Sequence, residues 1–298
     1  MSDKKSQDLR DLDADEIKKI LRGVTIPPRP TVSLEIKEVY PDVEKVANVV
    51  SRDPGIASAL LRTINSPFYG LRYEIKSIRQ AAVYMGLDSV INLVNAVILR
   101  GSVGTNLDPK VMTRFWDSTN DTAVAMTALC QFLGLPSMAD EAYTVGLFHN
   151  CGIPLLMSKQ PKYAHLLIKA YQQAEFDIMK IEADLIGSSH SAVGYYVCKT
   201  WGLSDAMCET ILEHHNRTAI PDLMLDMTDS HTLLGMLKMA EHITMEYEIL
   251  GGAQEDYEWE AVRTSVLDYF ELSDEDFNDL SEQIIEQLDA DQAQRLQV

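Results

Sequence analysis

The sequence predicts an all-α protein, folded as a two-lobed array of helices. Apolar residues recur at the three- and four-residue spacing of a helix along nearly the whole chain. No stretch shows the strict alternation of apolar and polar residues that a half-buried strand requires. With 298 residues, of which 46% are hydrophobic, the chain is long enough to bury a large core.

Capping residues and prolines place the helix boundaries. Residues 24–32, VTIPPRPTV, are expected to be extended, because proline removes a backbone donor and restricts the residue before it. Asp53 and Pro54 provide an N-cap and a first-turn proline for one helix, and Ser77 and Asp88 open two others. In chain order, the predicted helices cover residues 42–53, 53–66, 77–86, 88–101, 109–134, 139–152, 163–174, 177–187, 190–202, 204–216, 229–250 and 274–288, the last capped by Ser273.

The same signals divide the chain into segments. A helical extension is expected over residues 1–23, and an acidic helical extension over residues 251–298. The domain between them covers residues 24–250. The glycine- and proline-containing stretch GSVGTNLDP divides this domain into an N-terminal lobe, residues 24–107, and a second lobe, residues 108–250.

Composition narrows the class of partner. The net charge of −19 weighs against nucleic acid, because binding to the phosphate backbone needs clustered basic residues. Much of this charge lies in residues 254–298, which hold 14 acidic and two basic residues. No apolar run reaches the roughly 18 residues of a membrane span, and the polar N-terminus is not a secretory signal. We therefore expect no membrane contact and a cytoplasmic location, where the four cysteines stay free thiols.

Several motifs occur in the order of one known family. The segments IPPRPTVSLEI, SRDPGIASALLRTINSPFYG and SIRQAAVYMGLDSVINLV resemble the N-terminal half of an HDOD domain, the HD-related output domain of bacterial signalling proteins. FWDST, GLFHNCG, HSAVGYYVCKTWGLSDAMCETILEHHN and LKMAEHI resemble its HD-like half. The resemblance covers residues 24–250. It implies an all-α fold related to HD-type phosphohydrolases, and a regulatory role in place of catalysis.

The resemblance also implies where an HD phosphohydrolase would hold its metal. Such an enzyme uses a histidine, a His-Asp pair and a distant Asp, and the metal activates a bound water. At these positions the chain has Ser118, His149, Asn150 and Glu241. A hydroxyl and a neutral amide bring no charge to a metal. We therefore expect a degenerate site with no bound metal, no other cofactor and no catalytic residue.

His190, His214 and His215 are further candidates for the pocket. HSAVG and ILEHHN resemble stretches of HD-GYP proteins whose histidines contribute to a second metal, but the DGxGYP segment of those proteins is missing. The simpler interpretation is that His149, His190 and His214 hydrogen-bond within the core, as buried polar groups must. A small-ligand pocket built from the same residues is the other interpretation.

The predicted function is a non-catalytic module of signal transduction that acts through protein partners. Self-association into a homo-oligomer stays open. Two alternatives also stay open, namely a metal-dependent phosphohydrolase of the HD superfamily with altered ligands, and a sensor that binds a nucleotide or another small ligand in the former active-site cleft. No GxSxG elbow, P-loop or GxGxxG motif points to a different chemistry.

Overall fold

The computed structural model describes residues 21–295, except for residues 22, 66–70, 72, 105 and 174–176. Within this part the regular structure is helical and contains no strand, which confirms the prediction of an all-α fold. No helix among the described residues is both long enough and apolar enough to cross a bilayer. The predicted extension over residues 1–23 lies almost wholly outside the described residues.

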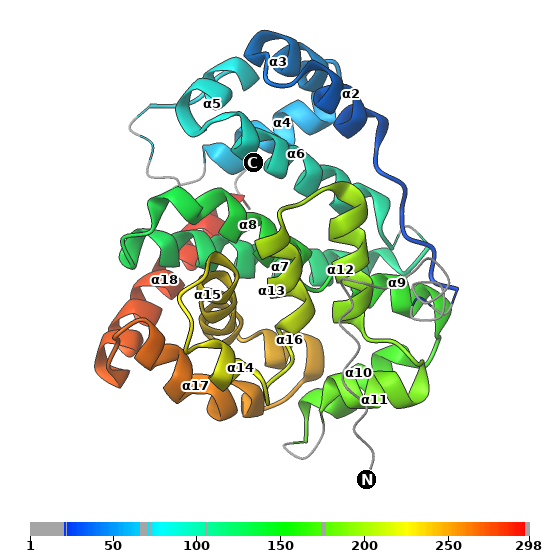
Figure 1. Ribbon diagram of the computed structural model, residues 1–298, viewed down its shortest axis with the longest axis vertical. Helices are drawn as coiled ribbons and strands as arrows, with labels where there is room; N and C mark the ends of the chain where they lie inside the picture. The colour runs from blue at the N-terminus through cyan, green and yellow to red at the C-terminus, as the bar shows by residue number, and fades with distance from the viewer. Residues whose placement is uncertain are drawn as a thin grey trace.

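Helices α2–α6 gather at one end of the molecule, shown at the top of Figure 1. Asp42, Asp53 and Ser77 cap α3, α4 and α5 by accepting hydrogen bonds from backbone N–H groups of the first turn. The helices of this group are α2 (Thr31–Val39), α3 (Val43–Ser51), α4 (Pro54–Ile64), α5 (Ile78–Met85) and α6 (Leu87–Ser102).

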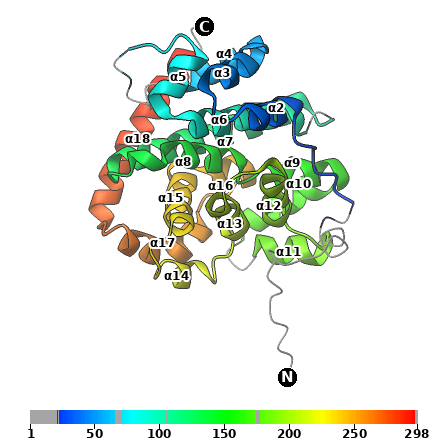
Figure 2. The same cartoon turned by 45° about the horizontal axis from the view of Figure 1, so that its top comes forward.

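The larger part of the molecule is built around α7 (Pro109–Phe132) and α8 (Ala139–Phe148), which pack against each other. α6 packs on α8, so the N-terminal helices share one hydrophobic core with this part. The other helices lie below and beside α7 and α8 (Figure 2). They are α9 (Gly152–Lys159), α10 (Tyr163–Tyr171), α11 (Ile178–Leu185), α12 (His190–Trp201), α13 (Asp205–Glu213), α14 (Ile220–Leu223), α15 (Asp229–Ile243), α16 (Glu246–Gly251), α17 (Tyr257–Tyr269) and α18 (Asp274–Arg295), with a short 3₁₀ turn, η3 (Pro136–Met138), before α8.

The acidic C-terminal segment packs onto the body of the molecule. α17 contacts α15, and α18 contacts α7. Ser273 and Asp276 cap the start of α18 reciprocally, since each accepts from the backbone N–H of the other. The acidic residues of α18 form its solvent face, and its buried residues recur at helical spacing: Phe277, Leu280, Ile284 and Leu288.

The structure differs from the predicted helices at several points. Thr31 and Val32 belong to α2, because Pro30 ends the extended stretch and forms the N-cap. α6 begins at Leu87, with Gly86 at its N-cap, one residue before the predicted start. The helices α2, α9, α14 and α17 are not predicted. α9 begins with Gly152 and has Pro154 in its first turn, which look like a break in the chain.

Candidate functional site

The segment GLFHNCG holds the end of α8 close to two other helices. A Cβ atom on Gly146 would lie 2.4 Å from the Cα of Ala123 in α7. A Cβ atom on Gly152 would lie 2.1 Å from the backbone oxygen of His190, the first residue of α12. Neither distance leaves room for a side chain. The two glycines therefore allow α8 to approach α7 and α9 to approach α12 on either side of His149 and Asn150.

His149 and Asn150 follow α8 and are completely buried. The Nδ1 of His149 donates to the carbonyl oxygen of Gly146, 2.6 Å away, so the lone pair of the neutral imidazole lies on Nε2, which is 3.2 Å from both carboxylate oxygens of Glu246. The Nδ2 of Asn150 lies 2.8 Å from this Nε2 and 2.6 Å from Oε1 of Glu246, and it donates to both. The opposite orientation of the amide would turn its oxygen toward two acceptors. Asn150 thus bridges the imidazole and a buried carboxylate.

Glu246 reaches this position because the chain breaks between α15 and α16. The prediction of one continuous helix over residues 229–250 is wrong, since α15 ends at Ile243 and Met245 adopts a left-handed conformation with φ of 54°. α16 then begins at Glu246, whose side chain is only 2% exposed. A left-handed methionine leaves no recognisable sequence signal. For this reason, sequence reasoning overlooks Glu246.

Ser118 lies on α7, buried but outside the hydrogen-bond network of the site. Its Oγ has no hydrogen-bond partner among the described residues. Thr122, one helical turn later on α7, donates from its Oγ1 to Oε2 of Glu246 at 3.0 Å. The hydroxyl that supports the buried carboxylate is therefore that of Thr122.

Glu241 lies beside His149 and Asn150, with His149 near one of its carboxylate oxygens and Lys238 near the other. Its Oε1 is 3.8 Å from Nε2 of His149, and its Oε2 is 2.5 Å from Nζ of Lys238. The same Nζ reaches Oε1 of Glu258 at 3.1 Å. Burial raises the pKa of Glu241 to about 8, against the opposing effect of Lys238. Burial is the largest single influence on His149 and disfavours its charged form, but the charge and hydrogen bond of Glu246, the charge of Glu241 and the carbonyl of Gly146 together outweigh it and raise the pKa of that imidazole above 6.5.

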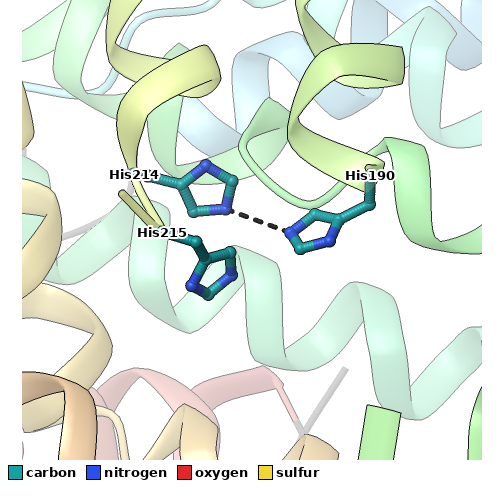
Figure 3. A group of neighbouring side chains, drawn as sticks. All are labelled: His190, His214 and His215. Carbon is teal, nitrogen blue, oxygen red and sulfur yellow. Dashed lines mark hydrogen bonds between the residues drawn. The ribbon is translucent and has the colours of Figure 1, made fainter. Parts of the chain in front are cut away.

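A second cluster of side chains consists of His190, His214 and His215 (Figure 3). The first begins α12, and the other two directly follow α13. The Nε2 atoms of His190 and His214 face each other at 3.3 Å. The ring of His214 also lies 5.5 Å from the ring of His149, so the two clusters adjoin.

Each ring of this second cluster is oriented through its Nδ1. The Nδ1 of His190 lies 2.8 Å from Glu182. The Nδ1 of His214 lies 2.7 Å from the carbonyl oxygen of Ile211, and that of His215 lies 2.7 Å from Glu258. Glu182 also accepts from the hydroxyl of Tyr163. Burial lowers the pKa values of the two histidines that follow α13 well below 6.5. Those two rings are therefore neutral at pH 7.

Of the residues predicted for the site, His149, Asn150 and Glu241 converge, and so do the three histidines of the second cluster. The side chain of Ser118 makes no hydrogen bond to any of them. Sequence reasoning missed the acidic residues that orient the histidines, and it missed the lysine that pairs with one of these acidic residues. These residues are Glu182, Glu246, Glu258 and Lys238.

Of the four HD positions, which are Ser118, His149, Asn150 and Glu241, only His149 and Glu241 offer a ligand. Their ligand atoms and one of Glu246 lie within 4.8 Å of one another, but Asn150 stands against two of these three side chains and does not suit a metal. A ligand must present a lone pair or a negative charge, but Asn150 presents N–H groups to Nε2 of His149 and to Oε1 of Glu246, two atoms that lie 3.2 Å apart. Those N–H groups satisfy both the imidazole and the carboxylate. The Oδ1 of Asn150 points away from both and has no hydrogen-bond partner among the described residues. Hydrogen bonds thus occupy the place where an HD enzyme would hold its ion.

The raised pKa of Glu241 predicts a pH dependence of stability. Between the ordinary pKa of 4.5 and the folded value of about 8, the folded protein keeps a proton that the unfolded chain has released. Stability should therefore fall as pH rises through this window, by up to about 1.4 kcal/mol per pH unit. Glu241→Gln should flatten the profile measured by urea unfolding between pH 5.5 and 8.5. The exposed Glu74→Gln is the control, and an unchanged slope in Glu241→Gln would contradict the assignment.

Comparison with known proteins supports the fold. The family model for the HDOD domain matches residues 26–217. A protein named "Putative signal transduction protein" from Marinobacter aquaeolei VT8 superimposes with a TM-score of 0.64 at 21% identity, over 91% of this chain and 59% of that chain. A "Putative metal-dependent phosphohydrolase" from Shewanella amazonensis SB2B gives a TM-score of 0.63 at 18% identity, over 92% and 98% of the two chains.

An HDOD domain protein of unknown function from Geobacter sulfurreducens gives a TM-score of 0.55 at 20% identity, over 87% of this chain and 97% of that chain. An uncharacterized protein of Treponema pallidum (strain Nichols) is 28% identical over 204 residues, which are 66% of this chain. The aligned part is 39% of the length of that relative, so this chain spans about two fifths of it. At these identities the solved structures support the helical fold alone.

Proposed function

The chain belongs to the HDOD domain family, and from that membership we propose that it is a regulatory module of signal transduction that acts through protein partners and does not hydrolyse phosphate esters. The observation that carries the proposal is the amide of Asn150, which donates to both His149 and Glu246 at the centre of the HD positions. Catalysis of the HD type needs a metal at this place to activate water. In this chain the N–H groups of Asn150 stand at that place and offer a metal no ligand.

The surface supports action through a partner. Val83 and Tyr84 on α5 are 74% and 59% exposed, and Tyr73, shortly before this helix, is 85% exposed. Exposed aromatic and aliphatic side chains of this kind are typical of contact surfaces. The solved structure from Marinobacter aquaeolei carries a name that refers to signal transduction, which agrees with this proposal.

The test is a hydrolysis assay on the full chain. Purified protein would be incubated with p-nitrophenyl phosphate and bis(p-nitrophenyl) phosphate in the presence of Mn²⁺, Fe²⁺ or Mg²⁺, beside a His149→Ala variant. We expect no turnover above that of the variant. Metal-dependent turnover that His149→Ala abolishes would establish the phosphohydrolase alternative instead.

A sensor of small molecules is the second candidate. A groove of about 560 Å³ opens beside α7, and Ser118 lines it together with two cations and two carboxylates, which are Lys110, Arg114, Asp117 and Asp121. Lys110 and Arg114 are the groups of this lining that could bind the phosphates of a nucleotide. Dialysis of the protein against radiolabelled nucleotides, with Arg114→Ala as the comparison, tests this function separately from the hydrolysis assay.

A further inference from the structure

The three histidines of the second cluster present lone pairs to one another. Each Nδ1 faces a carboxylate or a carbonyl oxygen, which can only accept, so each Nδ1 carries the hydrogen. The Nε2 of a neutral ring then has a lone pair and no hydrogen. The Nε2 atoms of His190 and His214 nevertheless lie 3.3 Å apart, and the Nε2 of His215 has no hydrogen-bond partner among the described residues. A proton or a metal cation between these Nε2 atoms would remove the repulsion of their lone pairs.

The distances agree with a metal ion in that place. One nitrogen from each ring lies within 4.8 Å of the others, and all three side chains are buried. In a tetrahedral site with Zn–N bonds of about 2.0–2.1 Å, the ligand nitrogens stand roughly 3.3 Å apart. The separation of 3.3 Å between the first two Nε2 atoms is one edge of such a tetrahedron.

We propose that His190, His214 and His215 bind one divalent transition metal ion of the zinc class through their Nε2 atoms. This site is distinct from the four HD positions, because it uses none of Ser118, His149, Asn150 or Glu241. The sequence led us to expect no metal, but that expectation rested on the four HD positions alone. The proposed site therefore departs from it. The proposal does not depend on the regulatory function, since a regulatory module and an enzyme could both hold a structural ion.

The surroundings of the three rings are those of a metal site. Histidine ligands ordinarily donate their second N–H to a carboxylate or a backbone carbonyl, which fixes the tautomer and the orientation of the ring. Glu182 and Glu258 fill this role for two of the rings, and the carbonyl of Ile211 fills it for the third. Glu182 also brings a negative charge close to the three rings, whereas the charge of Glu258 is shared with Lys238. Three imidazoles favour zinc, copper, iron or nickel over magnesium and calcium, which prefer oxygen.

The rival explanation is a proton shared by His190 and His214. A single proton can bridge those two Nε2 atoms, with Glu182 as the counterion. A proton shared in this way leaves the Nε2 of His215 without a hydrogen-bond partner among the described residues. The two explanations therefore differ in whether the third histidine takes part.

The test is a metal titration of the full chain, purified without a histidine tag and stripped with EDTA. Zn²⁺ binding would be measured by competition with a chromophoric chelator, and Co²⁺ would report a tetrahedral nitrogen environment through its visible absorption. The variants are His214→Asn and His215→Asn, because the asparagine amide can keep the hydrogen bond made by Nδ1 while it removes Nε2. His165→Asn is the control, because His165 is exposed and lies outside both clusters. His149→Asn tests the HD positions.

We expect the parent protein and His165→Asn to bind one equivalent of Zn²⁺ with equal affinity, and His149→Asn to stay within a few-fold of them. His214→Asn and His215→Asn should each weaken binding at least a hundredfold, and Glu258→Gln should weaken it roughly tenfold. X-ray absorption of the zinc-loaded parent should show three imidazole nitrogens at about 2.0 Å, which decides the matter even where a variant fails to fold.

Three results would overturn the site. The parent protein could fail to bind Zn²⁺ at a free zinc concentration of tens of micromolar, which is the result expected if His190 and His214 share a proton. Binding could survive in both His214→Asn and His215→Asn. Finally, His149→Asn could abolish binding, in which case the ion occupies the HD positions and the proposed function also needs revision. Absence of hydrolysis together with zinc binding would leave both proposals standing.

Discussion

Asn150→Asp should destabilise the folded protein by roughly 3–5 kcal/mol at pH 7. The amide nitrogen that lies 2.6 Å from Oε1 of Glu246 would become a carboxylate oxygen. Two buried carboxylates at this distance cannot both be ionised, and Glu241 lies close on the other side of His149. The variant must therefore hold extra protons or move its side chains apart. Urea unfolding, with the midpoint and slope compared to the parent, measures the loss.

The double variant Asn150→Asp with Glu246→Gln is the matched control. It restores one amide and one carboxylate across the same contact, with their positions exchanged. If the loss arises from repulsion, the double variant should recover most of the stability, and the interaction energy from the double-mutant cycle should be large. An Asn150→Asp protein as stable as the parent would mean that the amide does not bridge His149 and Glu246.

The helices were largely predictable because their signals are local. Asp53 caps α4 with Pro54 in its first turn, and Ser77 caps α5, as the sequence indicates. The buried residues of α18 likewise follow the helical spacing of the sequence. Short helices without such signals escape prediction. α9 begins with Gly152 and reads as a loop, although tertiary packing completes it.

The candidate site was only half predictable. His149 and Glu241 follow from the resemblance of their segments to HD proteins, but Glu246 depends on the left-handed turn at Met245. Glu182 is 1% exposed, although a glutamate on an amphipathic helix would be expected to face solvent. Its burial becomes understandable only once the start of α12 brings a histidine ring to it, and such a contact between distant segments leaves no local pattern.

Gly152 begins α9 and lies against His190, the residue of the second cluster that begins α12. Gly152→Ala should destabilise the protein by roughly 3–5 kcal/mol, because the new Cβ would lie 2.1 Å from the backbone oxygen and 2.9 Å from the Cα of His190. Backbone atoms at the start of a helix cannot rotate away as a flexible side chain can. α9 and α12 must therefore separate, and the loss should be measurable by guanidinium unfolding.

Gly101 offers the matched control, since it is an exposed helical glycine in α6 with nothing within 4 Å of an added Cβ. Gly101→Ala should be neutral or more stable by up to about 1 kcal/mol, because alanine is the better helix former. A Gly152→Ala protein within 1 kcal/mol of the parent would mean that α9 and α12 do not approach as closely as described. Because the strained atoms belong to His190, any folded Gly152→Ala protein should also bind Zn²⁺ more weakly than Gly101→Ala. The same glycine that closes the packing would then also be required to hold the three imidazoles together.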